Sequence, residues 1–383
     1  MGFPSCKPVH ARHRAGPGCA YDRRKAPPSG RKRVSAGLIA ALFLAGPAAA
    51  ETLRVATWDA GLSRSGPGLL LQDIEKGDPQ VVAVREVIDT VSPDILLLTG
   101  IDWDYDGQAL DALNRSLATP YPYFYAPRPN SGMQSGADLD GNGVLGEARD
   151  SQGYGRFPGQ GGMALLSRRP IRADAARDFS DLLWGDLPGS AIGKTGMSDE
   201  AQAVQRLSSS AHWDVPVEIG TGAPLHLLAF AATPPVFDGP EDRNGWRNHD
   251  EAAFWLRYLD GDLPETPPAR TYILLGDANL DPADAEGRRA TLQSLLSGGL
   301  LQDPAPRSKG AELAADPDHK GDPGLDTADF DGPGNLRVDY VLPSSDLKIA
   351  AAGVVWPAPD APLAKAAARA SRQKLVWVDI VLP

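Results

Sequence analysis

Residues 272–282 contain the feature that most constrains the fold and the chemistry of this chain. An apolar run, residues 273–275, predicts a buried strand, and Gly276 allows the chain to turn at its end. Asp277 and Asn279 follow, two residues apart, on the predicted turn. A carboxylate and an amide held at a rigid strand end can bind a metal ion or hold phosphate oxygens. The alternative interpretation is an Asx turn that only ends the strand.

A second apolar stretch, residues 337–343, favours the functional interpretation. It reads RVDYVLP and predicts another strand, with Asp339 in its middle. A charged side chain inside an apolar strand lowers the stability of the fold unless it is paired or binds a metal ion. Asp339 is therefore a further candidate site residue.

These two stretches, GDANLDP followed by RVDYVL, resemble the endonuclease/exonuclease/phosphatase superfamily, the metal-dependent phosphoesterases related to deoxyribonuclease I. The resemblance is to an exported bacterial branch of that superfamily. It covers most of the chain, through the segments LRVATWDAGL, PDILLLTGIDWD, GRFPGQGGMALLSRRPI, HWDVPV, TPPVFDGPEDRNGWRNHDEAAFW and SRQKLVWVDIVL.

Short strands alternating with few helices predict two sheets packed face to face, with helices outside. The resemblance implies the same architecture, an α/β four-layer α/β/β/α sandwich of two mainly antiparallel sheets. The expected strands are residues 52–58, 94–99, 162–167, 213–219, 224–229, 272–275, 338–342 and 375–381. The expected helices are residues 69–74, 80–91, 108–117 and 249–259, and the expected irregular segments are 121–157, 178–206, 233–248 and 305–335.

The resemblance also implies a reaction, in which one or two divalent ions, Mg²⁺ or Mn²⁺, assist the attack of water on a phosphoester. Asp277 is similar to the aspartate that positions or deprotonates this water. Asn279 is similar to its phosphate-binding partner, and Asp339 to the aspartate of the R-x-D-Y strand.

Four other positions depart from the superfamily pattern. Asp59 stands where the first strand of relatives ends in Asn, and Gly100 where the second strand ends in the metal-binding Glu. Ala231 and Gln373 each stand in place of a His, and neither can carry a proton at neutral pH. We hypothesise that Asp59 and Asp102 rebuild a weak metal site together with Asp339.

Residues 138–143 begin like a calcium loop of the EF-hand kind. Asp138, Asp140 and Asn142 supply oxygen at alternate positions, and Gly143 follows as the sixth residue. The twelfth position, where a Glu is expected, is Arg149. A bound Ca²⁺ and a solvated Asx-rich turn are therefore both open.

The first fifty residues predict a secretory signal. Lys32 and Arg33 precede an apolar run and a small-residue segment that ends at Ala50, after which we predict cleavage. The run is too short to span a membrane. We therefore expect a periplasmic or secreted protein with one domain, residues 51–383. Because both cysteines lie in the removed segment, we expect no disulfide.

Removal of residues 1–50 makes the chain strongly acidic. It takes away nine Lys or Arg residues and one acid, which leaves 29 basic and 48 acidic residues and a net charge of −19. Such a surface repels phosphate backbones, so long nucleic acid is a disfavoured partner. A small or lipid-linked phosphoester is the expected substrate, and the sequence predicts no oligomeric state.

Three functions remain open from the sequence. The first is an exported member of the phosphoesterase fold with a degraded, weak or inactive site. The second is an active phosphodiesterase or phosphatase with a rebuilt metal site. The third is a noncatalytic binding protein that recognises its ligand through residues 138–150 and the polar segment 233–248.

Overall fold

Alternating side chains along β1 (Thr52–Leu62) establish the layers of the fold. Leu53 and Val55 pack into one apolar core, and Ala56 and Trp58 pack into another on the opposite side of the strand. Because successive side chains of a strand point to opposite faces, the sheet that contains β1 is buried on both faces. The computed structural model describes residues 51–382, and the predicted signal segment lies outside them.

The first sheet has six strands in the order β12-β13-β1-β2-β4-β3. β1 and β2 are parallel, and the other neighbours in this sheet are antiparallel. Besides β1, its strands are β2 (Ile95–Ile101), β3 (Tyr123–Tyr125), β4 (Gly162–Ser167), β12 (Lys348–Val354) and β13 (Val376–Val381).

The second sheet has five strands in the order β11-β8-β7-β6-β5, with β7 and β8 parallel and the other pairs antiparallel. Its strands are β5 (Arg177–Asp178), β6 (His212–Val217), β7 (Leu225–Ala231), β8 (Tyr272–Asp277) and β11 (Asp339–Pro343). A separate two-stranded ribbon pairs β9 (Ala328–Phe330) with β10 (Gly334–Leu336).

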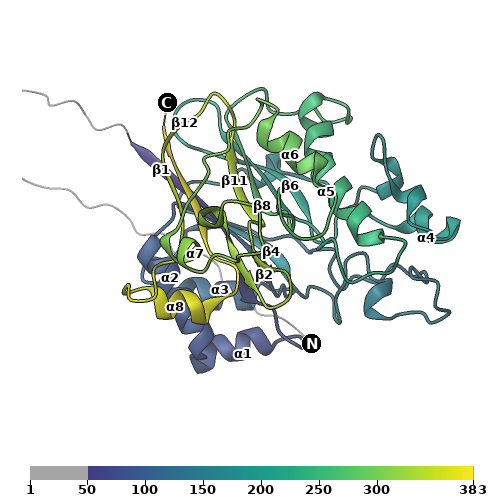
Figure 1. Cartoon of the computed structure of the whole chain (residues 1–383), viewed down its shortest axis with the longest axis horizontal. Coiled ribbons are helices and arrows are strands. Elements are labelled where there is room, and N and C mark those ends of the chain that lie inside the picture. The colour runs from purple at the N-terminus through teal and green to yellow at the C-terminus, as the bar shows by residue number, and fades with distance from the viewer. Residues whose placement is uncertain (1–50, 383) are drawn as a thin grey trace, which may run out of the picture. The chain divides into compact units, whose positions relative to one another are not determined.

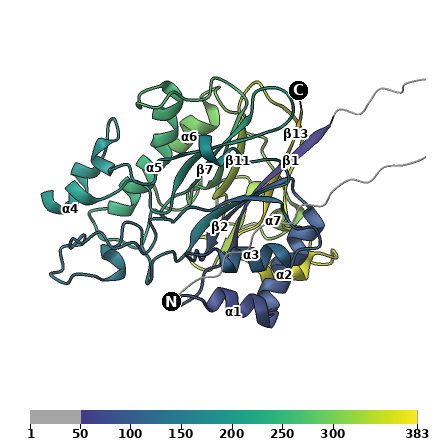
Figure 2. The ribbon, with the colours of Figure 1, turned by 180° about the vertical axis from the view of Figure 1, so that it is seen from behind.

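Helices cover the outer face of each sheet (Figures 1 and 2). One group comprises α1 (Leu69–Lys76), α2 (Pro79–Val91), α3 (Gln108–Arg115) and α8 (Ala364–Ala370), and its apolar side chains pack with Trp58 of the first sheet. α5 (Arg243–Asp260) and α6 (Ala290–Ser297) cover the second sheet. The short helices α4 (Asp199–Val204) and α7 (Lys309–Leu313) lie within connecting segments.

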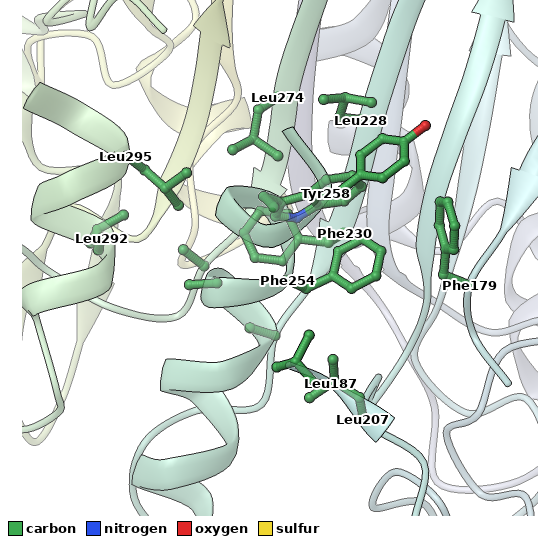
Figure 3. Close-up of a cluster of buried hydrophobic side chains, with 14 of the residues drawn as sticks. Phe179, Leu187, Leu207, Leu228, Phe230, Phe254, Tyr258, Leu274, Leu292 and Leu295 are labelled. Carbon is green, nitrogen blue, oxygen red and sulfur yellow. The ribbon is translucent and has the colours of Figure 1, made fainter. Parts of the chain in front are cut away.

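Three apolar cores separate the four layers. The middle core joins the two sheets, for example Val55 with Ile273 and Leu275. The core beneath α5 is aromatic, and Figure 3 shows Phe254 and Tyr258 of this helix close to Phe230 and Phe179. These layers confirm the predicted four-layer α/β/β/α sandwich of mainly antiparallel sheets.

The structure differs from the predicted elements mainly in the long connections. α5 begins at Arg243, inside the segment 233–248 that we expected to be loop, because its first turn is polar and carries no apolar periodicity. β12, α6 and α8 were not predicted, and α4, α7, β9 and β10 lie within or next to segments expected to be irregular. Among residues 51–382, no helix is both long and apolar enough to cross a membrane.

Candidate active site

Asp277 lies at the centre of the candidate site, at the carboxyl end of β8. Its neighbours across the sheet are Asp339 of β11 on one side and Ala231 of β7 on the other. Asp277 is 3% exposed and Asp339 is fully buried. Two predicted site residues and one of the substituted positions are thus brought together by strand pairing.

Asn279 and Gln373 hold the carboxylate of Asp277 in place. Oδ1 accepts a hydrogen bond from the backbone N–H of Asn279 at 2.7 Å. Oδ2 accepts bonds from Asn279 Nδ2 at 2.9 Å and from Gln373 Nε2 at 3.2 Å. Asn279 Nδ2 also donates to the Ala232 carbonyl at 2.9 Å, so both hydrogens of this amide are engaged inside the protein. Only the amide oxygen of Asn279 remains free for a ligand.

The side chain of Asp59 in β1 lies over the backbone of Gly100 in β2. Gly100 has a φ of +61°, and a Cβ added to it would lie 2.4 Å from both carboxylate oxygens of Asp59. The Asp59 carboxylate therefore fills the space that a side chain at position 100 would need. Its Oδ1 accepts a bond from the Gly61 N–H at 2.8 Å.

The three carboxyl groups perturb one another. Burial raises the pKa of Asp59 to about 6, against a smaller opposing effect of the Gly61 N–H. Burial, followed by repulsion from Asp59, raises the pKa of Asp277 to about 7. Burial, and then the charges of Asp277 and Asp59, raise the pKa of Asp339 well above its usual value. Each ionised acid thus makes ionisation of the others more costly.

Two oxygens at this site lack a hydrogen-bond donor among the described residues. Asp339 Oδ2 accepts a bond from Thr327 Oγ1 at 3.1 Å, but Asp339 Oδ1 is buried without a partner. Gln373 Oε1 is also buried and unpartnered. Buried polar atoms of native proteins are nearly always satisfied, and oxygen donors are the ligands that Mg²⁺ and Ca²⁺ prefer. The residues present therefore fit a hard divalent cation.

Asp102 is not brought together with Asp59. Its carboxylate accepts bonds from the backbone N–H groups of Arg64 at 2.8 Å and Gly161 at 3.1 Å. It borders a different groove, of about 470 Å³, beside Trp103. Asp102 does not continue the face of position 100, since β2 is irregular between Leu98 and Ile101, Gly100 is left-handed, and the strand ends at Ile101.

The candidate calcium loop gathers Asp138 and Asp140 with Asp150, which the sequence pattern did not indicate. One carboxylate oxygen from each lies within 4.8 Å of the others, and this is the one such group of three acids or histidines among residues 51–382. Asn142 lies beside them and donates to Asp140 Oδ2 at 3.2 Å. The N–H of Gly143, with smaller opposing and supporting effects, lowers the pKa of Asp138. Asp150 follows Arg149 by one residue, so the acid sits one place beyond the expected twelfth position.

A cleft of about 1370 Å³ opens above the strand ends. Asp59, Gly100, Asp277 and Asn279 line it, together with the loop around Asp138. The cleft is also lined by Arg149, Phe237 and Arg243, from the two segments considered above for ligand recognition, and by Tyr154 and Arg156, which the sequence did not indicate. All lie on connections between strands, where the only signal was unusual loop length.

The described histidines have structural surroundings away from this cleft. His212 is fully buried, and burial lowers its pKa to about 4. His226 Nδ1 contacts Asp214 at 2.6 Å and His249 Nδ1 contacts Asp250 at 2.8 Å. No histidine of the described residues borders the cleft.

Comparison with known proteins identifies the class to which this fold and site belong. Residues 56–372 match the model of the Endonuclease/Exonuclease/phosphatase family, and the chain belongs to that family.

The chain is also similar to several solved structures. An endonuclease/exonuclease/phosphatase from Beutenbergia cavernae is 17% identical, with a TM-score of 0.50 over 86% of this chain and 72% of that chain. A family protein from Leptotrichia buccalis is 16% identical, with a TM-score of 0.48 over 86% of this chain and 100% of that one. The mannosyl-6-phosphatase Bt3783 of Bacteroides thetaiotaomicron is 13% identical, with a TM-score of 0.44 over 86% and 100%. None of the curated proteins compared with the chain matches it.

Proposed function

We propose that this protein is a slow, divalent-metal-dependent phosphoester hydrolase with a rebuilt metal site. The observation that carries this proposal is the position of the Asp59 carboxylate over Gly100. The acid missing from the second strand is replaced by one that reaches the same space from the first strand. Asp59 and Asp339 would hold the ion beside Asp277, and the ion would supply charge neutralisation of the phosphate and its leaving oxygen when bound.

The wide spacing of these acids suits a hydrated ion. They do not form a group whose oxygens all lie within 4.8 Å of one another, unlike the acids of the 138–150 loop. Mg²⁺ usually keeps several waters and takes only one or two protein carboxylates together with substrate oxygens. Mg²⁺ or Mn²⁺ is therefore the proposed metal.

Asp277 is the proposed base for the attacking water. A pKa of about 7 places it close to neutral pH, where a general base is most effective. The bonds from Asn279 and Gln373 fix its orientation, so these two residues position the base. Asn279 thus positions Asp277, and it also lines the cleft.

The absence of histidine at positions 231 and 373 explains why we expect slow turnover. Gln373 donates one hydrogen bond to Asp277 but has no proton to give to a leaving group. Each missing acid–base or charge-stabilising group costs roughly 10²–10⁴-fold in rate. We expect kcat to fall by about that factor below the common range of about 1–10³ s⁻¹.

The proposed setting is outside the cytoplasm. The charged, apolar and small-residue pattern of residues 1–50 supports export and cleavage after Ala50. The charge of −19 that remains after cleavage supports a small or lipid-linked phosphoester as substrate in preference to long nucleic acid.

Direct measurement of cation binding tests the proposal without relying on turnover. Calorimetric titration of residues 51–383 with Mn²⁺ should show binding at the cleft. Asp59→Asn should weaken this binding by at least about tenfold, in line with the loss of an anionic ligand. Asp102→Asn is the matched control, because Asp102 is also an aspartate at the end of a strand of the first sheet but borders a different groove, and it should leave binding unchanged.

Hydrolysis of an aryl phosphodiester with Mg²⁺, Mn²⁺ and Ca²⁺ in turn, beside Asp277→Ala, completes the test. Slow turnover that depends on the metal and on Asp277 is the expected result. Cation binding without turnover would leave a noncatalytic binding protein on the same fold. Mn²⁺ binding that Asp59→Asn does not change would refute the rebuilt site.

We also propose that Asp138, Asp140 and Asp150 hold a separate Ca²⁺ ion, with Asn142 beside them. The close approach of the three carboxylates supports this assignment. Ca²⁺ should raise the melting temperature of the wild type but not that of Asp140→Ala. An equal rise in both proteins would argue that the loop is only an Asx-rich turn.

A further inference from the structure

Two exposed aromatic side chains, Tyr154 and Phe237, border the cleft from different loops. Phe237 is 83% exposed and Tyr154 is 63% exposed, and both border the space above Asp277. Single exposed apolar residues are common on protein surfaces. This cleft, however, has two large exposed rings at its border and the carboxylate of Asp277 inside it. The general frequency of exposed apolar residues does not explain this combination.

The loop around Phe237 is built to hold the ring outward. Phe237 has a φ of +71°, which a bulky residue adopts only under constraint. Asn244, in the first turn of α5, fixes the chain on both sides of the ring. Its backbone N–H donates to Asp238 Oδ2 at 2.5 Å, and its Nδ2 donates to the Val236 carbonyl at 2.7 Å. The ring is therefore placed by the helix and does not simply lie on a loose loop.

Close backbone packing fixes Tyr154 in a similar way. A Cβ on Gly153 would lie 1.7 Å from the Ser209 carbonyl oxygen, and a Cβ on Gly155 would lie 2.6 Å from the Gly132 nitrogen. The backbone on both sides of Tyr154 is thus pressed against neighbouring segments, and its side chain is directed to solvent. Within residues 51–382, neither Tyr154 nor Phe237 stacks on another aromatic ring.

We infer that Tyr154 and Phe237 determine substrate specificity by stacking on a flat aromatic ring carried by the phosphoester, as in a nucleotide or an aryl phosphate. Aromatic side chains bind bases of any sequence because every base presents a π-face. The inference rests on the proposed function and narrows its substrate class. It favours a ring-bearing ester, because two exposed rings border a cleft that polar residues such as Ser209, Thr233 and Asp238 also line.

Arg156, two residues after Tyr154, is available to bind the phosphate group of this ligand. Arg156 is exposed and borders the cleft, and its guanidinium forms no ion pair or hydrogen bond with the residues that the structure describes. Arginine binds phosphate oxygens through two parallel N–H groups. Tyr154 and Arg156 therefore present a ring contact and an anion contact two residues apart.

Calorimetric titration of the full chain with Mg²⁺ present tests this inference. The ligands are adenosine 5′-phosphate, phenyl phosphate and glycerol phosphate, and adenosine serves as the unphosphorylated probe. At least one of the two ring-bearing esters should bind more tightly than glycerol phosphate by roughly 5- to 100-fold, the range expected for stacking on aromatic side chains. The comparison of the adenosine and phenyl esters distinguishes a nucleobase from a simple aryl group.

Variants of Tyr154 and Phe237 test whether these two side chains cause the preference for ring-bearing esters. Phe237→Ala and Tyr154→Ala should reduce the preference for the ring without changing the affinity for glycerol phosphate, and Phe237→Trp should restore it. Phe124→Ala is the matched control, since Phe124 is a half-exposed ring on β3 that borders the other groove. It should leave all affinities unchanged.

The outcomes separate the two proposals. Equal binding of all three esters, or a preference that both alanine variants retain, would overturn the role of the rings and leave the hydrolase intact. Binding of adenosine without binding of glycerol phosphate would support the ring site and contradict the proposed phosphoester site. Binding of none of the four ligands would contradict both.

Discussion

At the level of single residues, the Asp59 carboxylate occupies the space next to the Cα of Gly100, so the two positions depend on each other. A side chain at position 100 would have to adopt a left-handed φ and displace the Asp59 carboxylate. A Glu at this position would therefore require a change in the position of Asp59.

Gly100→Ala should be unusually costly. We expect a loss of roughly 2–4 kcal/mol in the free energy of unfolding, from left-handed strain together with the clash against Asp59. In an Asp59→Ala background the cost should fall to about 1–2 kcal/mol, the strain alone. Gly77→Ala is the control, because Gly77 has a φ of +67° and open space around its Cβ position. Urea unfolding of the wild type, the two single variants, the double variant and the control measures the difference; equal costs with and without Asp59 would show that the two residues do not interact.

Asp326 should make stability depend on pH. Burial, and then repulsion from Asp281, raise its pKa to about 7, so the folded protein binds this proton more tightly than the unfolded chain does. Stability from this group is present below about pH 4 and is lost as the pH rises through about 7. Asp326→Asn should therefore stabilise the protein at pH 8, by on the order of a few kcal/mol, and much less at pH 4.

Thermal unfolding of Asp326→Asn at both pH values, beside the exposed-site control Asp318→Asn, provides the measurement. A gain in melting temperature that is the same at pH 4 and pH 8 would show that the proton on Asp326 is not involved. The control should have no pH-dependent effect.

α5 organises the loops around the cleft at the level of elements. Glu251 accepts bonds from the backbone N–H groups of Ser209 and Thr233, at 2.6 Å and 2.7 Å. Asp250 accepts bonds from Trp184 Nε1 at 2.6 Å and from the Ala191 N–H at 2.7 Å. Two adjacent acids on one helix thus hold three segments that connect the strands.

Asp250→Ala should detach the segment around Trp184. Because two buried donors lose their acceptor, we expect a cost of roughly 2–4 kcal/mol in the free energy of unfolding. Asp260→Ala, at the exposed end of the same helix, is the matched control and should change stability by less than about 0.5 kcal/mol. Similar losses in the two variants would mean that helix content, and not the loop contacts, determines the effect.

Net charge governs the partners at the level of the whole molecule. The chain after residue 50 has 48 acidic and 29 basic residues, so its long-range field opposes a polyanion even where arginines border the cleft. We expect no electrophoretic mobility shift of long duplex DNA by residues 51–383 at about 0.15 M salt, where surface fields extend only about 8 Å. A salt-sensitive shift at micromolar protein would contradict this and point to a local basic surface.

The sequence by itself determined the layers and the identity of most candidate residues. Alternating apolar residues in β1 and the apolar runs of β2 and β8 predict buried strands because side-chain direction in a strand is local. Asp277 and Asp339 were identifiable for the same reason, since each is a polar residue in an apolar strand context. The α5 boundary was not predictable, because its first turn has no apolar face and its first residue, Arg243, donates to the carbonyl of Leu139, which is distant in the sequence.

Only the tertiary structure decided which residues meet. Asp59 lies over Gly100, and Asp102 borders another groove, because the left-handed Gly100 interrupts the alternation of side chains in β2 and the strand ends at Ile101. Asp150 joins Asp138 and Asp140, and Tyr154 and Phe237 face one cleft from loops more than eighty residues apart in the chain. Local pattern fixes the direction of a side chain within its own element, whereas the distance between elements depends on packing and register, which no local pattern encodes.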